Sequence, residues 1–289
     1  MRHPFFASPH PLVFAHRGGS ALAPENTIEA FDTGLALGAD GLELDVHLSR
    51  DGAVVVHHDR TLERTTDGRG EVAAFTSDEL ARVDAGYHFF QGAGTYPVHP
   101  YHPYRGRGIG VPTLSAVLAR YRDARIIVEL KVNSAELAAA AIDVVRRAGA
   151  VDRVCFGSFG LRVLRAARAG EPAIATSAAR EEVRWALYRS WCRWPVRRPA
   201  YGGYQAPEWS GRTHVVSRRF VEMAHRANLG VQVWTVDREE DARRLLGWGV
   251  DALITDRPDV VVPLTRSLSR HLRTTAQRSI VKDAAADTR

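Results

Sequence analysis

The chain has 289 residues, of which 45% are hydrophobic and 25% charged, and its formal net charge is +6. These values are typical of a globular protein with a sizeable core, in one large α/β domain or two small ones. Residues 264–289 contain six Lys/Arg and two Asp, so most of the excess charge belongs to the end of the chain. The rest is close to neutral, which argues against a nucleic-acid-binding protein.

The cysteines and the N-terminus indicate the compartment. Cys155 and Cys192 lie outside any CxxC or His-rich spacing, which argues against a zinc site. Prolines at positions 4, 9 and 11 interrupt the N-terminal run, so we expect no signal peptide. No stretch approaches the roughly 20 apolar residues of a membrane span. We therefore expect a protein of the reducing cytoplasm.

Short apolar runs alternate with a helical pattern near the start of the chain. Residues 12–16 predict a strand, residues 26–37 a helix and residues 41–48 a second strand. The helix should begin with Asn26 as its N-cap and end at Gly38, because these residue types favour helix starts and stops.

The segment after the second strand breaks this rhythm. The turn at 49–52 predicts a hairpin between residues 41–48 and 53–57. Residues 60–112 contain turn residues, a short helical pattern near 77–83 and a stretch rich in Gly, Pro, His and Tyr. A featureless loop this long is rare in a compact domain, so we expect an inserted subdomain.

The second half of the chain returns to alternating strands and helices. The expected strands are 125–132, 153–156, 173–176, 231–236 and 252–256, and the expected helices include 220–227 and 239–246. Repeated strand–helix units predict parallel strands, and their number favours a closed (β/α)8 TIM barrel with a small insertion after the third strand. A doubly wound open sheet is the alternative. We expect one domain over residues 1–263 and a flexible basic tail over 264–289.

Residues 182–212 are rich in Trp and Arg. Trp185, Trp191 and Trp194 lie close together in this segment with Tyr188. Two interpretations stay open: a surface at a membrane interface, or a partly buried helix or lid beside the site.

Acidic residues gather on two of the predicted strands. Glu43, Asp45 and His47 share one face of their strand, and Glu129 and Lys131 share one face of another. An edge strand with one solvent-exposed face would explain the polar residues of either strand alone. Both together, in a parallel α/β pattern, favour acids that point into the barrel near its C-terminal mouth.

The acids Glu43, Asp45 and Glu129 predict a metal site. Clustered carboxylates repel one another unless a cation joins them. Oxygen ligands suit a hard ion, so we expect one divalent cation, Mg²⁺ or Ca²⁺, rather than Zn²⁺. Such an ion would polarise a phosphoryl group.

Two histidines at separate strand ends, His16 and His58, complete a site for phosphodiester cleavage. Imidazoles titrate in the range that proton transfer needs, although a lone histidine is more often structural. Arg17 and Lys131 would bind the phosphate. Trp234 would either stack on the alcohol moiety or pack in its strand.

The remaining polar residues of these motifs have simpler interpretations. His47 shares the acidic face and would support the metal ligands. His57 alternates away from His58 and should be structural. Asp59 and Asp256 follow strands, and we expect them to cap the turns that come next.

From Phe14 to Pro258 the chain resembles the glycerophosphodiester phosphodiesterase family. The motifs that carry the resemblance are His16-Arg17-Gly18, Pro24-Glu25-Asn26-Thr27, Glu43-Leu44-Asp45-Val46, His58-Asp59, Glu129-Leu130-Lys131, Val233-Trp234-Thr235-Val236 and Thr255-Asp256. The resemblance implies a modified TIM barrel, a divalent metal, and cleavage of a glycerophosphodiester to sn-glycerol 3-phosphate and an alcohol. It assigns the metal to Glu43, Asp45 and Glu129, the acid–base pair to His16 and His58, and the phosphate to Arg17 and Lys131.

Two other functions stay open. The chain could be a lysophospholipase D that acts on lysolipids, or a non-catalytic barrel that binds phosphodiesters. The expected partner is a small-molecule glycerophosphodiester and not a nucleic acid. Membrane contact, the head group and the oligomeric state stay open.

Overall fold

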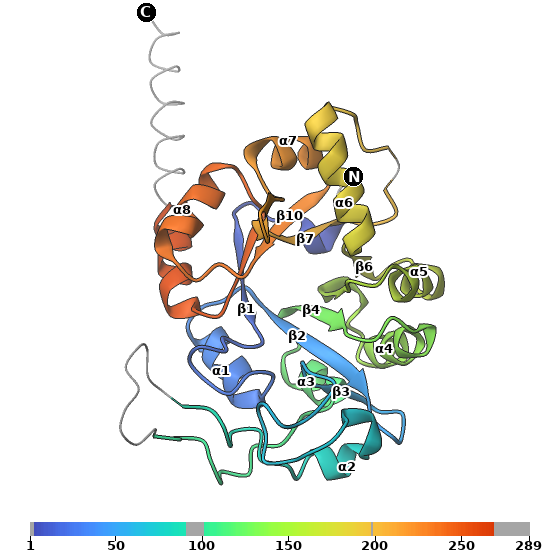
Figure 1. Cartoon of the computed structure of the whole chain (residues 1–289), viewed down its shortest axis with the longest axis vertical. Helices are drawn as coiled ribbons and strands as arrows, with labels where there is room; N and C mark the ends of the chain where they lie inside the picture. The colour runs from blue at the N-terminus through green and yellow to red at the C-terminus, as the bar shows by residue number, and fades with distance from the viewer. Residues whose placement is uncertain (1–2, 91–100, 198, 269–289) are drawn as a thin grey trace, which may run out of the picture.

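Eight parallel strands form a barrel in the computed structural model, which describes residues 3–90, 101–197 and 199–268 (Figure 1). Their order around the barrel is β1 (Leu12–His16), β2 (Gly41–Leu48), β4 (Arg125–Leu130), β5 (Val154–Gly157), β6 (Ala175–Thr176), β7 (Gly203–Pro207), β10 (Gly230–Trp234) and β11 (Ala252–Thr255). The barrel closes between β6 and β7 through a parallel bridge from Ser177 to Gly203. The predicted (β/α)8 fold is confirmed.

The predicted hairpin after β2 is also present. Strand β3 (Val54–Val56) pairs antiparallel with β2, with Val46 opposite Val56. This pairing adds a ninth strand to the sheet, outside the barrel, and the predicted insertion of residues 60–112 follows it along the chain.

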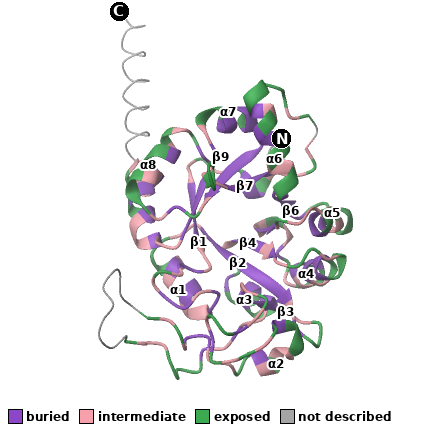
Figure 2. Ribbon diagram, viewed as in Figure 1, coloured by how far each residue is buried: buried purple, intermediate pink, exposed green. Residues whose placement is uncertain are grey.

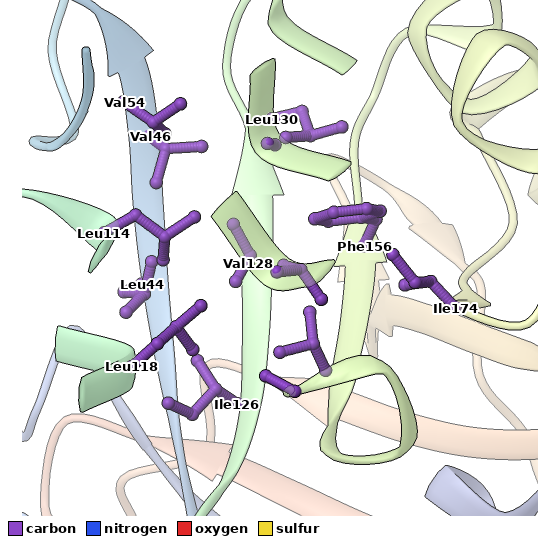
Figure 3. Close-up of a cluster of buried hydrophobic side chains, with 14 of the residues drawn as sticks. Leu44, Val46, Val54, Leu114, Leu118, Ile126, Val128, Leu130, Phe156 and Ile174 are labelled. Carbon is purple, nitrogen blue, oxygen red and sulfur yellow. The ribbon is translucent and has the colours of Figure 1, made fainter. Parts of the chain in front are cut away.

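Helices cover the outer surface of the barrel. They are α1 (Ile28–Ala36), α3 (Leu114–Arg120), α4 (Ala135–Arg147), α5 (Leu161–Gly170), α6 (Arg180–Cys192), α7 (Arg218–Arg226) and α8 (Glu239–Gly247). Residues 258–268 are helical as well. Figure 3 shows the packing: Leu44 and Val46 of β2 and Val128 of β4 meet Leu114 and Leu118 of α3. These alternate positions face outward, so the residues between them face the barrel interior.

Aromatic residues just before β1 fill part of the barrel interior. The short 3₁₀ helix η1 (Pro4–Phe6) brings Phe5 and Phe6 into contact with Phe14 of β1 and Ile254 of β11. Phe5 stacks on Phe14 with ring centroids 5.9 Å apart, and both rings are buried. Burial of these rings excludes water from this part of the interior.

Helix α1 begins one residue later than predicted. Its N-cap is Thr27, whose hydroxyl accepts a hydrogen bond from the Ala30 amide at 3.2 Å. The prediction of Asn26 as the cap is wrong. Asn26 has a left-handed backbone, with φ of 59°, and its side chain turns to Asp45.

The insertion has a small hydrophobic cluster of its own. It contains the 3₁₀ helix η2 (Val72–Ala74) and helix α2 (Ser77–Leu80). Leu62, Val72, Leu80, Ile109 and Val111 pack together with Val55 of β3. Residues 91–100 of the predicted insertion lie outside the described residues.

The C-terminal part of the barrel extends further than predicted. Leu264 and Thr265 are buried in the helix that runs to residue 268, so the packed chain passes the boundary expected at 263. The remainder of the predicted basic tail, 269–289, lies outside the described residues. No helix in the described ranges is both long and apolar enough to cross a bilayer.

Candidate active site

Strand register brings three carboxylates together inside the barrel. Asp45 of β2 lies opposite Glu129 of β4, and Glu43 lies two residues before Asp45 on the same face. Glu43 and Asp45 are buried, and each of the three acids offers an oxygen within 4.8 Å of the others. The structure therefore brings together the three predicted metal ligands on neighbouring strands.

The electrostatics of this cluster suit a cation. Burial, together with the charges of Asp45 and Glu129, raises the pKa of Glu43 to about 8. Burial also acts on Asp45, but Lys131 and Arg17 outweigh it and lower the pKa of that carboxyl. The nearby side-chain cations thus compensate Asp45 and leave Glu43 with an unfavourable negative charge, which a divalent ion would relieve.

His16 lies at the edge of the cluster. Its Nδ1 is 2.6 Å from Asp256 Oδ1, and its Nε2 is 3.7 Å from Glu43 Oε2. Burial alone would lower the pKa of His16, but the Glu43 charge and the Asp256 hydrogen bond outweigh burial and raise it to about 9. Asp256 therefore fixes the ring with Nε2 toward the carboxylates.

His58 is held by a carboxylate in the same manner as His16. Its Nδ1 lies 2.5 Å from Asp59 Oδ1, and Arg64 Nε donates to the other oxygen of Asp59. His58 lies near enough to Asp45 to be among the charges that lower the pKa of Asp45, after burial, Lys131 and Arg17. The interpretation of Asp59 and Asp256 as turn caps is wrong, because both carboxylates bind histidine rings.

Arg17 and Lys131 both contact the carboxylates. Lys131 Nζ lies 3.2 Å from Asp45 Oδ1 and 3.1 Å from Glu129 Oε1. Arg17 Nε lies 3.3 Å from Asp45 Oδ2, and its Nη1 donates to Glu25 at 2.9 Å. The two predicted phosphate-binding cations therefore border the predicted metal ligands.

The backbone of Arg17 also belongs to the site. Its amide donates to Glu43 Oε2 at 3.1 Å. The next residue, Gly18, has φ of 90°, and a Cβ there would lie 2.6 Å from the Ala30 side chain. Only glycine lets this loop pack on α1 while the Arg17 amide points at Glu43.

Sequence reasoning missed two further residues of the site. Asn26 Nδ2 donates to Asp45 Oδ2 at 2.9 Å, and its Oδ1 accepts from the Asp45 amide. Glu25 binds Arg17 and also receives both terminal nitrogens of Arg64, at 2.8 and 2.7 Å. The Pro-Glu-Asn-Thr motif marked both residues as part of the family resemblance. Its spacing along the chain did not predict which side chains they would bind.

The two other histidines of these motifs bind backbone carbonyls. His57 Nε2 lies 3.1 Å from the Thr61 carbonyl, in agreement with its structural interpretation. His47 Nε2 lies 3.1 Å from the His58 carbonyl. His47 thus supports the loop that carries His58 rather than a carboxylate.

Two aromatic residues lie at the C-terminal ends of β10 and β5. Trp234, at the end of β10, meets Phe159 edge to face with ring centroids 5.8 Å apart. Phe159 follows β5, is 44% exposed, and lies under the Arg180 guanidinium at 4.7 Å. Trp234 therefore faces an aromatic neighbour that the sequence analysis did not single out.

Comparison with known proteins identifies this arrangement. The model of the glycerophosphoryl diester phosphodiesterase family matches residues 16–260. The chain belongs to this family. The match begins at His16 and covers every residue described in the site above, so the predicted family, the barrel fold and the class of enzyme, a phosphodiesterase acting on glycerophosphodiesters, are confirmed.

Curated relatives within the glycerophosphoryl diester phosphodiesterase family span nearly the whole chain. A glycerophosphodiester phosphodiesterase of Caldanaerobacter subterraneus subsp. tengcongensis is 33% identical over 260 residues, which cover 88% of this chain and 98% of the relative. One of Bacillus subtilis is 30% identical and covers 86% of this chain and 84% of its own length.

Solved structures of the family share the fold. The glycerophosphoryl diester phosphodiesterase domain of an uncharacterised Mycobacterium tuberculosis protein has a TM-score of 0.75 at 25% identity, covering 89% of this chain and 99% of the domain. An Oleispira antarctica phosphodiesterase in complex with its product sn-glycerol-3-phosphate has a TM-score of 0.68 at 27% identity. The match covers 88% of this chain and 96% of that protein.

Proposed function

We propose that this chain cleaves glycerophosphodiesters to sn-glycerol 3-phosphate and an alcohol at the mouth of its barrel, with one divalent cation on Glu43, Asp45 and Glu129. The observation that carries the proposal is the pair of imidazoles, each held at Nδ1 by a carboxylate, beside three clustered carboxylates. The sn-glycerol-3-phosphate bound as product to the Oleispira antarctica phosphodiesterase supports the substrate class.

The cation would be Mg²⁺ or Ca²⁺, since the three candidate ligands offer only oxygen. When bound, such an ion would polarise the phosphoryl group as a Lewis acid. Lys131 and Arg17 would bind the same phosphate, because both already lie within 3.3 Å of Asp45.

The two histidines would carry the protons. A water molecule would attack phosphorus, and one imidazole would remove its proton through Nε2. In the variant of this route in which the neighbouring glycerol hydroxyl attacks, a cyclic phosphate forms, and a water molecule then opens it to sn-glycerol 3-phosphate. The other imidazole donates a proton to the departing alkoxide as the phosphorus–oxygen bond breaks. Asp256 and Asp59 are positioning residues, because each accepts from the Nδ1 of its histidine and leaves Nε2 for the substrate.

The insertion would contribute to the site through Arg64. This side chain binds Asp59 and both oxygens of Glu25, and so joins the loop after β3 to the loop after β1. The described part of the insertion, residues 60–90 and 101–112, would therefore hold His58 and Arg17 in place.

Hydrolysis of glycerophosphocholine by the purified full chain tests the proposal. Choline and sn-glycerol 3-phosphate should form in equal amounts. Their formation should stop when EDTA is added and resume when Mg²⁺ or Ca²⁺ is restored. Full turnover in EDTA would reject the metal site. Turnover of lysophosphatidylcholine but not glycerophosphocholine would favour the lysophospholipase D, and binding without product would favour the non-catalytic barrel.

A further inference from the structure

Helix α6 carries a row of exposed aromatic side chains that the site does not use. Trp185, Tyr188 and Trp191 follow one another at three-residue spacing, and Trp194 comes just after the helix. Their exposed fractions are 63%, 43%, 53% and 67%. Neighbouring rings touch, with centroids 6.0 Å apart for Trp185 and Tyr188 and 5.5 Å for Tyr188 and Trp191. Figure 2 shows α6 at the periphery, with exposed positions along its outer side.

The opposite side of α6 already supplies the packing that the fold needs. Ala186, Leu187 and Ser190 are buried against the barrel. A surface helix normally has polar residues on its outer side. The fold therefore leaves a row of large aromatic rings partly exposed on the outer side of α6, and contiguous exposed apolar surface of this kind is a mark of interaction sites.

Arginines flank the aromatic row, and the two acids of α6, Glu181 and Glu182, lie in its first turn, before the row begins. Residues 183–197 contain four arginines and no aspartate or glutamate. None of the ion pairs found among the described residues involves Arg184, Arg189 or Arg193. The row is thus bordered by guanidinium groups that lack a carboxylate partner within the described chain.

The positive charge continues onto α7. A groove of about 610 Å³ between the end of α6 and α7 is lined by Arg193, Trp194, Arg218, Arg219, Met223 and Arg226. Glu222 also lines it and lies 3.6 Å from Arg226. The groove thus joins apolar and cationic side chains in one concave surface.

We propose that the surface formed by α6 and this groove binds an anionic lipid bilayer. Trp and Tyr place an apolar ring and a polar edge at the depth of lipid head groups, and arginine binds phosphate oxygens in pairs. The combination matches a surface of negative phosphates above hydrocarbon, and Glu222, the acid that lines the groove, is paired with Arg226. It goes beyond hydrolysis of a small molecule and does not depend on the mechanism at the barrel mouth.

Two other occupants fit less well. A second copy of this chain, paired by two-fold symmetry, would bring the same unpaired arginines face to face. An RNA strand could stack on the rings, but the nearly neutral body of the chain lacks the broad basic surface that such binding uses.

Vesicle sedimentation of the full chain tests this surface. The chain should bind vesicles of phosphatidylglycerol and phosphatidylcholine in equal parts, and not vesicles of phosphatidylcholine alone. Lipids with brominated acyl chains should quench part of its tryptophan emission. Quenching separates this surface from the basic residues 269–289, because that segment contains no tryptophan.

Two sets of variants locate the binding surface. Trp185→Ala with Trp191→Ala and Trp194→Ala should weaken the vesicle partition by about tenfold or more. Arg184→Glu with Arg193→Glu should do the same and also remove the quenching, while the tryptophans stay in place. Both should hydrolyse glycerophosphocholine at the native rate, which shows that they are folded.

Matched controls use exposed residues elsewhere. Tyr101→Ser removes an aromatic ring that is 67% exposed, and Arg122→Glu reverses a charge on an exposed arginine after α3. Neither should change vesicle binding. The proposal fails if the native chain ignores anionic vesicles, if the α6 variants bind as well as the native chain, or if they abolish a dimer or RNA binding instead.

Discussion

The charged groups at the barrel mouth and those along α6 differ in burial and in ion pairing. At the mouth, Asp45 is 1% exposed and is surrounded by Arg17, Lys131 and Asn26 at distances of 2.9 to 3.3 Å. Along α6, Arg184 and Arg193 are exposed and have no carboxylate within ion-pair distance in the described chain. Paired, buried charge suits a preorganised catalytic site, whereas the unpaired, exposed charge along α6 is available to a partner outside the chain.

The largest effect should come from removing charge at the centre of the mouth. Asp45→Asn keeps the hydrogen bonds to Asn26 but leaves Arg17 and Lys131 without their shared anion. Loss of several kcal/mol of metal-assisted stabilisation corresponds to a fall in kcat on the order of 10⁴-fold. Calorimetric titration should show Mg²⁺ or Ca²⁺ binding to the native chain and not to the variant. Native metal affinity in the variant would contradict the ligand assignment.

The acid–base pair comes next. His16→Ala and His58→Ala should each lower kcat by about 10³-fold, within the range for groups that transfer protons in the transition state. Glycerophosphocholine turnover measures the loss, and binding of sn-glycerol 3-phosphate should change little. Near-native turnover in either variant would remove that histidine from the mechanism.

The two positioning carboxylates should matter less than the rings that they hold. Asp256→Asn and Asp59→Asn keep the size of the side chain but remove the charged acceptor at Nδ1. We expect losses of roughly 10- to 10³-fold in kcat with KM nearly unchanged, because the wrong tautomer or orientation affects proton transfer rather than binding. A change in KM alone would make these residues parts of the substrate pocket instead.

The smallest effect concerns a paired charge far from both regions. The hydrogen bond from Arg120, and a second from Tyr121, hold the pKa of Asp32 below its usual value. The stabilisation is therefore present at neutral pH and is lost as the pH falls through the lowered pKa. Because Asp32 and Arg120 are 46% and 53% exposed, Asp32→Asn should cost at most about 1 kcal/mol. Denaturant unfolding should show this cost at neutral pH and not in acid; an equal cost at both would reject the ion pair.

The local sequence predicted most elements of the barrel. Apolar runs with period two and the helix–glycine–strand pattern identified β1, β2, β4, β10 and β11, because each pattern depends on neighbours within one element. The same alternation placed Glu43 and Asp45 on the inner face of β2, opposite the apolar residues that pack on α3.

Partnerships between distant residues depended on the tertiary structure. Asp256 lies 240 residues from His16 in the chain, and the two meet only because β1 pairs with β11 when the barrel closes. Asn26 looked like a helix cap, but the approach of Asp45 turns its side chain into the site.

What the sequence determined by itself was therefore the set of chemical groups and the strand faces that carry them. Only the tertiary structure decided which of these groups lie within hydrogen-bond or ion-pair distance of one another. The physical reason is that hydrophobic periodicity is a local property, whereas the pairing of charges depends on distances that barrel closure sets.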